Sequence, residues 1–180
     1  MRIITGRFKG RRLAAPSGSA VRPTSDGLRE TLFNVLGDRV SGARVLDAYA
    51  GTGAIGLEAL SRGASQATFV ERDRRVISVL QGNITTCGAS EACAIIRDDF
   101  LVFAGRVTGR DHFDLVLLDP PYEATDLHAV LAAAAPLVAP AGQLVIEHSR
   151  RRVVPESIDA LARTRLLVAG DSALAWYAHG

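Results

Sequence analysis

The chain has 180 residues, of which 48% are apolar and 22% are charged, and its formal net charge at pH 7 is +2. This length suits one domain with a sizeable core, and no apolar run approaches the roughly 20 residues of a membrane-spanning helix. Two cysteines are too few for a disulfide framework, and no Cys/His group has metal-site spacing. The first residues, MRIITGRFKGRR, lack the apolar segment of a secretory signal, so we expect a cytoplasmic protein without a metal.

The positive charge is concentrated at the N-terminus. Residues 1–25 contain six basic residues and no acidic one, whereas the remainder contains 15 basic and 19 acidic residues, a net charge of −4. A basic segment on a mildly acidic body favours a polyanionic partner; the alternative is a solvated, frayed terminus. Gly6, Phe8 and Gly10 separate the cations in a hairpin-like pattern, which favours nucleic acid. The candidate RNA-binding cations are Arg2, Arg7, Lys9, Arg11, Arg12 and Arg22.

In chain order, the pattern predicts two short strands within residues 1–15 and a capped helix over 26–36. From residue 43 onwards, strands and helices alternate. The predicted strands are 43–50, 66–72, 91–99, 112–119 and 142–149, and the predicted helices are 54–62, 73–88, 126–139 and 155–163. Residues 166–178 contain a Gly-Asp-Ser turn between two apolar runs, which predicts an antiparallel hairpin.

This alternation indicates an α/β fold. We expect a Rossmann-like, doubly wound and mostly parallel sheet of seven strands, including the antiparallel terminal hairpin, over residues 26–180. Residues 1–25 would add a small basic β-hairpin extension. In such sheets ligands bind beyond the carboxyl ends of the strands, so residues that follow strands are the candidates for a functional site.

A glycine-rich loop follows the strand predicted at 43–50. Residues 51–56 match G-x-G-x-x-G, beginning with Gly51 and Gly53, and Glu71 follows 20 residues after Gly51. This spacing is typical of a dinucleotide site, in which the acidic side chain binds a ribose hydroxyl. An NAD-dependent dehydrogenase is therefore one alternative, and a purely structural strand-to-helix turn is another.

Two observations favour S-adenosylmethionine over NAD. Asp47 precedes the glycine loop at the end of the predicted strand, where a carboxylate repels a pyrophosphate and attracts an ammonium group. The chain also has too few other residues for a dehydrogenase's catalytic domain. After the third predicted strand, Asp99 and Phe100 are favoured over Asp98 to hold an adenine, although this acidic pair could instead cap the next segment.

The sequence Asp119-Pro120-Pro121-Tyr122 ends the fourth predicted strand. The Asp119 carboxylate and the Pro120 carbonyl could accept hydrogen bonds from an exocyclic amine, freeing its lone pair to attack a sulfonium methyl group, while Tyr122 stacks on the base. Such chemistry requires no metal and no covalent intermediate. The alternative is a rigid turn after a buried strand.

Five segments together resemble the bacterial 16S ribosomal RNA guanine-N2 methyltransferase family, whose members are class I S-adenosylmethionine-dependent enzymes. In chain order, these segments are MRIITGRFKGRRL, RPTSDGLRETLFNVL, VLDAYAGTGAIGLEALSRGA, FVERD and LLDPPY. The resemblance covers nearly the whole chain and is faint only from about residue 150. It implies methyl transfer to a guanine of small-subunit rRNA in a partly assembled particle, and we expect a monomer.

The resemblance also implies roles for individual residues. Its catalytic positions are Asp119, Pro120 and Tyr122, and its cofactor-binding positions are Asp47, Gly51, Gly53, Glu71, Asp99 and Phe100. Arg22 and Thr24 match a motif beside the family's active site, and the basic arm matches its RNA-contacting hairpin. The Asp-Pro-Pro-Tyr sequence alone also admits methylation of adenine N6, cytosine N4 or protein glutamine. A further alternative is a non-catalytic RNA-binding protein.

Overall fold

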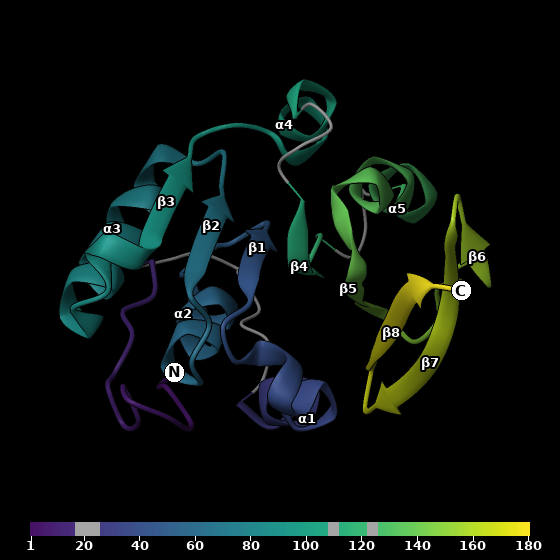
Figure 1. The fold of residues 1–180 in the computed structure, drawn as a ribbon. Helices are drawn as coiled ribbons and strands as arrows, with labels where there is room; N and C mark the ends of the chain where they lie inside the picture. The colour runs from purple at the N-terminus through teal and green to yellow at the C-terminus, as the bar shows by residue number, and fades with distance from the viewer. Residues whose placement is uncertain (17–25, 108–111, 122–125) are drawn as a thin grey trace.

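A computed structural model describes residues 1–16, 26–107, 112–121 and 126–180 of the chain. Within these ranges, eight strands form one sheet in the order β3-β2-β1-β4-β5-β8-β7-β6 (Figure 1). The strands are β1 (Arg44–Ala48), β2 (Gln66–Val70), β3 (Cys93–Ile96), β4 (Phe113–Leu118), β5 (Val138–Ser149), β6 (Ser157–Ile158), β7 (Leu161–Ala169) and β8 (Ser172–His179). The first five strands are parallel to one another, and the other three pair antiparallel.

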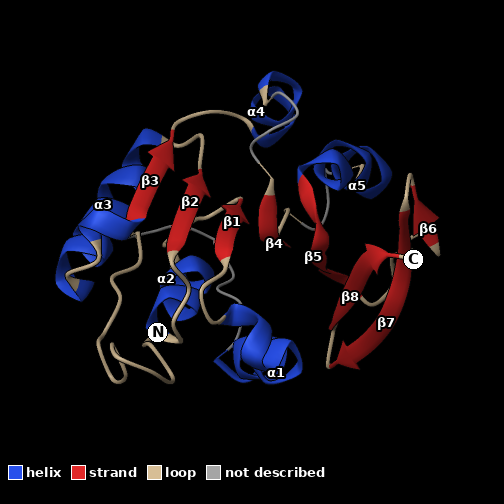
Figure 2. Cartoon of the chain, in the orientation of Figure 1, coloured by secondary structure: helices blue, strands red, loops and turns tan. Residues whose placement is uncertain are grey.

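Helices cover both faces of this sheet (Figure 2). The α-helices are α1 (Asp26–Leu36), α2 (Ala54–Ser61), α3 (Arg74–Cys87), α4 (Phe100–Arg106) and α5 (Leu127–Ala134). Short 3₁₀ helices are η1 (Gly37–Val40), η2 (Ser90–Ala92) and η3 (Ala135–Leu137). None of the described helices is both long and apolar enough to cross a bilayer.

The central strands are apolar on both sides, so the sheet separates two cores. Side chains of α1, α2, α3 and the N-terminal arm pack on one face, and those of α4 and α5 pack on the other. Alternate residues of one strand contribute to different cores, as Leu115 and Val116 of β4 illustrate. This burial on both faces explains why strands such as FDLVLL appear in the sequence as nearly continuous apolar runs.

The structure confirms the predicted fold class and most of its elements. The helix expected over 26–36 has the predicted bounds, because Asp26 begins it and Leu28, Leu32 and Phe33 give it a buried stripe. The terminal hairpin is also present, and its strands are longer than the pattern suggests.

The prediction of seven strands and of a helix over 155–163 is wrong. These residues instead form β6 and the start of β7, and β6 is the additional strand that brings the described sheet to eight. Asp159 has a φ of 49°, which an α-helix does not accommodate. Pairing is favoured here because Leu161 lies opposite His179 of β8, and the Arg163 N–H donates to the Glu156 carbonyl at 2.7 Å.

The N-terminal arm reverses direction as expected, but its two predicted strands reduce to a single antiparallel bridge between Arg2 and Arg12. Two backbone groups that would extend the hairpin bind another element instead: the N–H groups of Ile4 and Thr5 donate to the Glu58 carboxylate at 2.8 and 3.0 Å. The arm is nevertheless firmly packed, and its apolar and basic residues separate. Its buried apolar residues are Ile3, Phe8 and Leu13, and its exposed cations are Arg2, Arg7, Lys9, Arg11 and Arg12.

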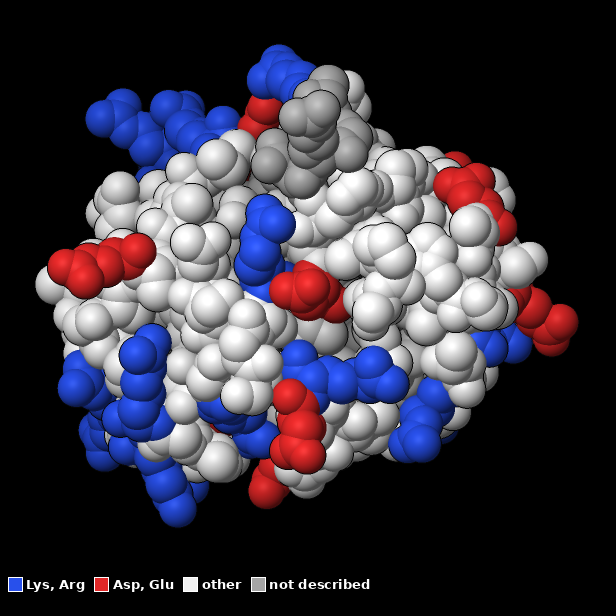
Figure 3. All heavy atoms as spheres, in the orientation of Figure 1, with Lys and Arg blue, Asp and Glu red and all other residues white. Residues whose placement is uncertain are grey.

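Basic side chains gather over the arm in the space-filling view (Figure 3). Not all of them are equally free. The Arg11 guanidinium donates to the Thr86 carbonyl of α3 and, like that of Arg7, lies over the Phe8 ring. The Arg11 side chain is therefore held against α3, whereas Arg2, Lys9 and Arg12 are exposed.

The Glu58 carboxylate on α2 attaches the arm to the body of the protein. Its side chain is fully buried and accepts from the Arg62 Nε at 2.8 Å in addition to the two arm N–H groups. The buried Arg29 guanidinium lies 3.8 Å away and donates through Nη2 to the Arg2 carbonyl at 2.6 Å. A charged carboxylate is therefore held inside the core by four nearby donors, two of which belong to the arm.

We expect Glu58→Gln to lower the free energy of unfolding by about 3 kcal/mol, because it removes the buried negative charge beside Arg29 and leaves, among the described residues, only the exposed Asp26 carboxylate, at 3.0 Å, to pair with that buried guanidinium. Urea unfolding measures this loss, and proteolysis within residues 1–16 should accelerate in parallel. The matched control is Glu30→Gln, which changes an exposed carboxylate of α1 and should alter stability by less than about 0.5 kcal/mol. Equal stability of the two variants would contradict this role of Glu58.

Candidate active site

The parallel register brings the ends of four strands into one row. Ala48 of β1 lies between Val70 of β2 and Leu118 of β4, and Val70 pairs with Ile96 of β3. The residues that follow these strand ends include the glycine loop and the candidate acidic groups. The segments predicted to carry chemistry therefore converge at the carboxyl edge of the sheet, as the fold class requires.

The glycine loop turns sharply between β1 and α2. Gly51 and Gly53 have φ values of 53° and 78°, a region that other residues rarely adopt. A Cβ at Gly53 would lie 2.3 Å from the Leu80 side chain, and one at Gly56 would lie 2.4 Å from the Phe69 ring. The second and third glycines therefore allow close packing of the loop and α2 against α3 and β2.

Two carboxylates accept hydrogen bonds from backbone N–H groups of the glycine-rich G-x-G-x-x-G segment. Asp47 is 1% exposed, and its Oδ2 accepts from the Gly56 N–H at 2.8 Å. Glu71 accepts from the Gly51 N–H at 3.0 Å and from the Asp73 N–H at 2.8 Å. Each carboxylate thus shapes the loop itself, and their contacts with a cofactor remain predictions.

Burial raises the pKa of Asp47 well above its usual value, and the nearby Asp119 and Glu71 carboxylates raise it further. The hydrogen bond from Gly56 lowers the pKa, by less than burial raises it but by more than either neighbouring carboxylate does. The Glu71 and Asp119 carboxylates, which directly follow β2 and β4, are therefore close enough to Asp47 of β1 to repel its negative charge. Such an edge disfavours a pyrophosphate and suits a ligand that carries positive charge.

The segment after β3 has a structural role that agrees with the capping alternative. Asp99 is the N-cap of α4 and accepts from the Leu101 N–H at 2.9 Å, whereas Asp98 binds the Arg106 guanidinium at 2.7 Å. Phe100 is 2% exposed, and its ring centre lies 5.4 Å from that of Tyr49. Capping leaves lone pairs on Asp99 for a further donor, so its role in holding an adenine stays a prediction.

Tyr49 directly follows β1 and has a φ of 63°, which is uncommon for a residue with a side chain. Its ring is half-buried against Phe100, and burial raises the pKa of its hydroxyl to about 12. The sequence does not single out this residue as part of the site. An aromatic residue in left-handed backbone beside a glycine loop is a strained feature of the kind found at ligand sites.

Asp119 and Pro120 lie where the sequence places them, directly after β4 and beside the end of β1. The Asp119 N–H donates to the Ala48 carbonyl at 3.5 Å, its side chain is half-buried, and Pro120 is buried. Tyr122, Arg22 and Thr24 lie outside the described residues. The arrangement brings an acidic side chain and a carbonyl of fixed direction to the same edge as the glycine loop.

The arm also reaches this edge, through a residue that the sequence analysis does not select. The Asn83 side chain of α3 bonds both to Ala14 of the arm and to the Thr52 carbonyl of the glycine loop. The sequence does contain an indication that Asn83 has a structural role, because it lies among Leu80, Ile84 and Cys87 on the buried face of α3. A polar residue on an apolar stripe requires a partner, but the sequence does not tell which one.

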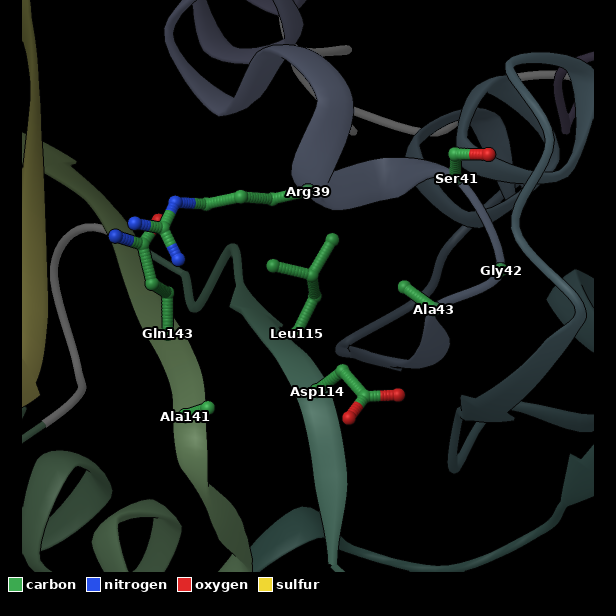
Figure 4. A pocket seen from close by; sticks show the side chains of 8 residues that line it. All are labelled: Arg39, Ser41, Gly42, Ala43, Asp114, Leu115, Ala141 and Gln143. Atoms are coloured by element: carbon green, nitrogen blue, oxygen red, sulfur yellow. The ribbon is translucent and has the colours of Figure 1, made fainter.

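A hollow of about 350 Å³ lies at the other end of the sheet (Figure 4). It is formed by residues before β1, at the start of β4 and in β5, and the Arg39 side chain extends across it toward Gln143. The Asp114 carboxylate on its border already accepts from the Arg44 N–H at 2.7 Å. None of the described candidate residues lines this hollow, so we place the functional site at the carboxyl edge.

Comparison with known proteins agrees with this arrangement. A family model described as conserved hypothetical protein 95 matches residues 1–178. The chain is 37% identical to "Putative rRNA methyltransferase YlbH" of Bacillus subtilis, and the match covers 98% of each protein. It is 43% identical to ribosomal RNA small subunit methyltransferase D of Escherichia coli, over 68% of this chain and 60% of that protein.

Solved structures give the same picture. "Putative methyltransferase yhhF" from Escherichia coli superposes with a TM-score of 0.87 at 33% identity, and the match covers 99% of this chain and 97% of that one. A hypothetical protein of Thermus thermophilus has a TM-score of 0.85 at 30% identity, covering 100% of this chain and 99% of that one.

The buried Asp47 makes stability depend on pH in a defined direction. Its pKa is raised on folding, so its contribution to stability is complete below the unfolded value of about 3.9 and is lost as pH rises through the folded value. Asp47→Asn keeps an oxygen for the Gly56 N–H and does not ionise. Its melting temperature should therefore rise relative to that of the wild type as the pH increases from about 4 through the raised folded-state pKa of Asp47, by roughly 2–4 °C for each kcal/mol.

Thermal unfolding of both proteins across this pH range measures the difference. Asp114→Asn is the control, because that carboxylate is exposed and its variant should track the wild type. A melting-temperature difference for Asp47→Asn that stays constant with pH would show that Asp47 is already ionised at no cost.

Proposed function

Because this chain belongs to the conserved hypothetical protein 95 family, we propose that it methylates the exocyclic N2 amine of a specific guanine in 16S ribosomal RNA. S-adenosylmethionine would be the methyl donor, and the substrate would be rRNA in a partly assembled small subunit. Two relatives named as rRNA methyltransferases support the reaction class. The observation that carries the proposal is the convergence of Asp119 and Pro120 with the glycine loop at one edge of the sheet.

The charge of this edge fits the proposed donor. When bound, S-adenosylmethionine supplies a methyl group on a positively charged sulfonium and carries no phosphate. Burial and the nearby Asp119 and Glu71 carboxylates raise the pKa of Asp47, so its negative charge is unfavourable unless a cation or a proton compensates it. Gly51 and Gly53 leave two positions of the loop without a side chain. Glu71 would bind ribose hydroxyls, and Asp99 with Phe100 would hold the adenine.

The chain's own groups then prepare the acceptor. The lone pair of a base amine is delocalised into the ring, so the amine is a weak nucleophile. The Asp119 carboxylate and the Pro120 carbonyl would each accept one amine N–H, which concentrates the lone pair on the face opposite them. Tyr122 would stack on the base and hold it in plane. Positioning and preorganised acceptors of this kind account for large parts of many rate enhancements.

The arm supplies the surface for RNA. Arg2, Lys9 and Arg12 project from a segment that is itself anchored by buried apolar side chains. A flipped or loop nucleotide is the expected target, because a base inside a duplex does not reach a pocket at the edge of a sheet. We propose residues 1–25 as the RNA-contacting arm and residues 26–180 as the methyltransferase domain.

Other acceptors are the alternative outcomes. The chain is also 33% identical, over 61% of its length, to a release factor glutamine methyltransferase of Agrobacterium fabrum. Incubation with tritiated donor and unmodified 16S rRNA, small subunits or a release factor separates these classes, and nuclease digestion with mass spectrometry identifies the methylated base. Calorimetry with NAD in place of S-adenosylmethionine tests the dehydrogenase alternative, which the acidic edge disfavours.

We expect Asp119→Ala to lower the turnover number about 10²–10³-fold, because one of the two amine acceptors is lost. Binding of S-adenosylhomocysteine, measured by calorimetry, should change little. Asp114→Ala is the matched control, since it removes an exposed carboxylate from the other end of β4 and should retain turnover. Near-normal turnover of Asp119→Ala would remove this residue from the mechanism.

Replacing Arg7, Lys9 and Arg12 together by alanine should weaken RNA binding in a salt-dependent way. Each phosphate contact on single-stranded RNA contributes about −0.7 to the slope of log K against log salt, so the slope should become less steep by roughly two. Arg11 is retained because it holds the arm to α3. The control variant replaces three exposed cations elsewhere, Arg39, Arg44 and Arg165, and an equal change of slope there would contradict a special role of the arm.

A further inference from the structure

Asn83 uses its side-chain amide to join two segments that lie far apart in the sequence. It is 2% exposed. Its Oδ1 accepts from the Ala14 N–H at 2.8 Å, and its Nδ2 donates to the Ala14 carbonyl at 3.1 Å and to the Thr52 carbonyl at 2.9 Å. A carboxylate at this position has no donor for either carbonyl, and an apolar side chain leaves all three backbone groups without their partner.

The two segments that Asn83 joins have different proposed tasks. Ala14 lies two residues after Arg12, which is the last cation of the described arm. Thr52 lies between Gly51 and Gly53, which both have a positive φ. A second contact connects the same segments, because the Thr52 hydroxyl lies 3.9 Å from the Met1 sulfur. The arm therefore touches the glycine loop near both of its own ends, through a single buried amide and a thioether.

We propose that Asn83 is a positioning residue that couples RNA binding on the arm to cofactor binding at the glycine loop. This inference rests on the proposed function. RNA phosphates that bind the arm cations stabilise the packed position of the arm, and Asn83 transmits this stabilisation to the Thr52 carbonyl. A loop that is already ordered loses less conformational entropy when the cofactor binds, so RNA tightens cofactor binding. By linkage, the cofactor tightens RNA binding by the same factor.

The backbone of the glycine loop explains why the loss of Asn83 should affect the coupling between the two sites and not the sites themselves. The Gly51-Thr52-Gly53 segment has two residues without side chains, so its backbone depends on external hydrogen bonds for order. Glu71 holds the Gly51 N–H, whereas Asn83 holds the Thr52 carbonyl and also hydrogen-bonds to the arm. The other contact between the loop and the arm is the long one from the Thr52 hydroxyl to the Met1 sulfur. Loss of the amide should therefore separate the two sites without altering the arm cations or the catalytic loop.

The experiment measures the dissociation constant of S-adenosylhomocysteine on the full chain, by calorimetry, with and without unmodified small ribosomal subunits. We expect RNA to tighten binding at least about fivefold in the wild type, a typical allosteric coupling. In Asn83→Ala this ratio should fall close to one. Asn34→Ala, which removes an exposed amide of α1, should keep the wild-type ratio. A mere loss of stability would change urea midpoints and leave the ratio intact.

Ala14→Pro provides a second variant if Asn83→Ala does not fold. Proline removes the N–H that Asn83 accepts and leaves the glycine loop and α3 unchanged, so it should also reduce the ratio. A ratio of one in the wild type, or an unchanged ratio in the variants, would overturn the coupling. These outcomes differ from failure of the proposed function, in which the wild type neither binds S-adenosylhomocysteine nor methylates RNA.

Discussion

The shared register of β1, β2, β3 and β4 is the constraint on which the candidate site depends. Because parallel strands keep their carboxyl ends together, every residue that follows a strand is brought to one edge, whatever its distance in the sequence. The cost of this convergence is visible in the raised pKa of Asp47, which is buried close to two other carboxylates. The same three carboxylates make this edge of the sheet favourable for a positively charged ligand.

The second organising feature is the way the arm is held. A basic N-terminal segment on its own would be solvated, but here backbone groups of the arm bind buried polar side chains of the domain. Glu58 and Ser61 of α2 hold one part, and Asn83 of α3 holds the end. The cations are thereby presented on a surface of defined shape, and Asn83 also connects that surface with the glycine loop.

Several expectations failed for reasons that are local to particular residues. The pattern over 155–163 resembles a helix in composition, but β7 pairs with the edge of β8, and β6 then pairs with the edge of β7. The arm has hairpin-like glycines, but Glu58 competes for its N–H groups. Helix α4 is absent from the predicted elements because it is only seven residues long and depends on Asp99 as its cap. A segment of this length shows too little hydrophobic periodicity to predict a helix.

The sequence by itself determined the alternation of strands and helices, the glycine loop, the acidic residues after each strand and the basic arm, because these depend on residue type and spacing along the chain. The tertiary structure alone decided which polar groups meet: Asp47 with Gly56, Glu58 with the arm, and Asn83 with both Ala14 and Thr52. Such contacts join residues up to 69 positions apart, and no local pattern encodes them. A buried polar residue in the sequence indicates that a partner is needed, and only the folded chain supplies one.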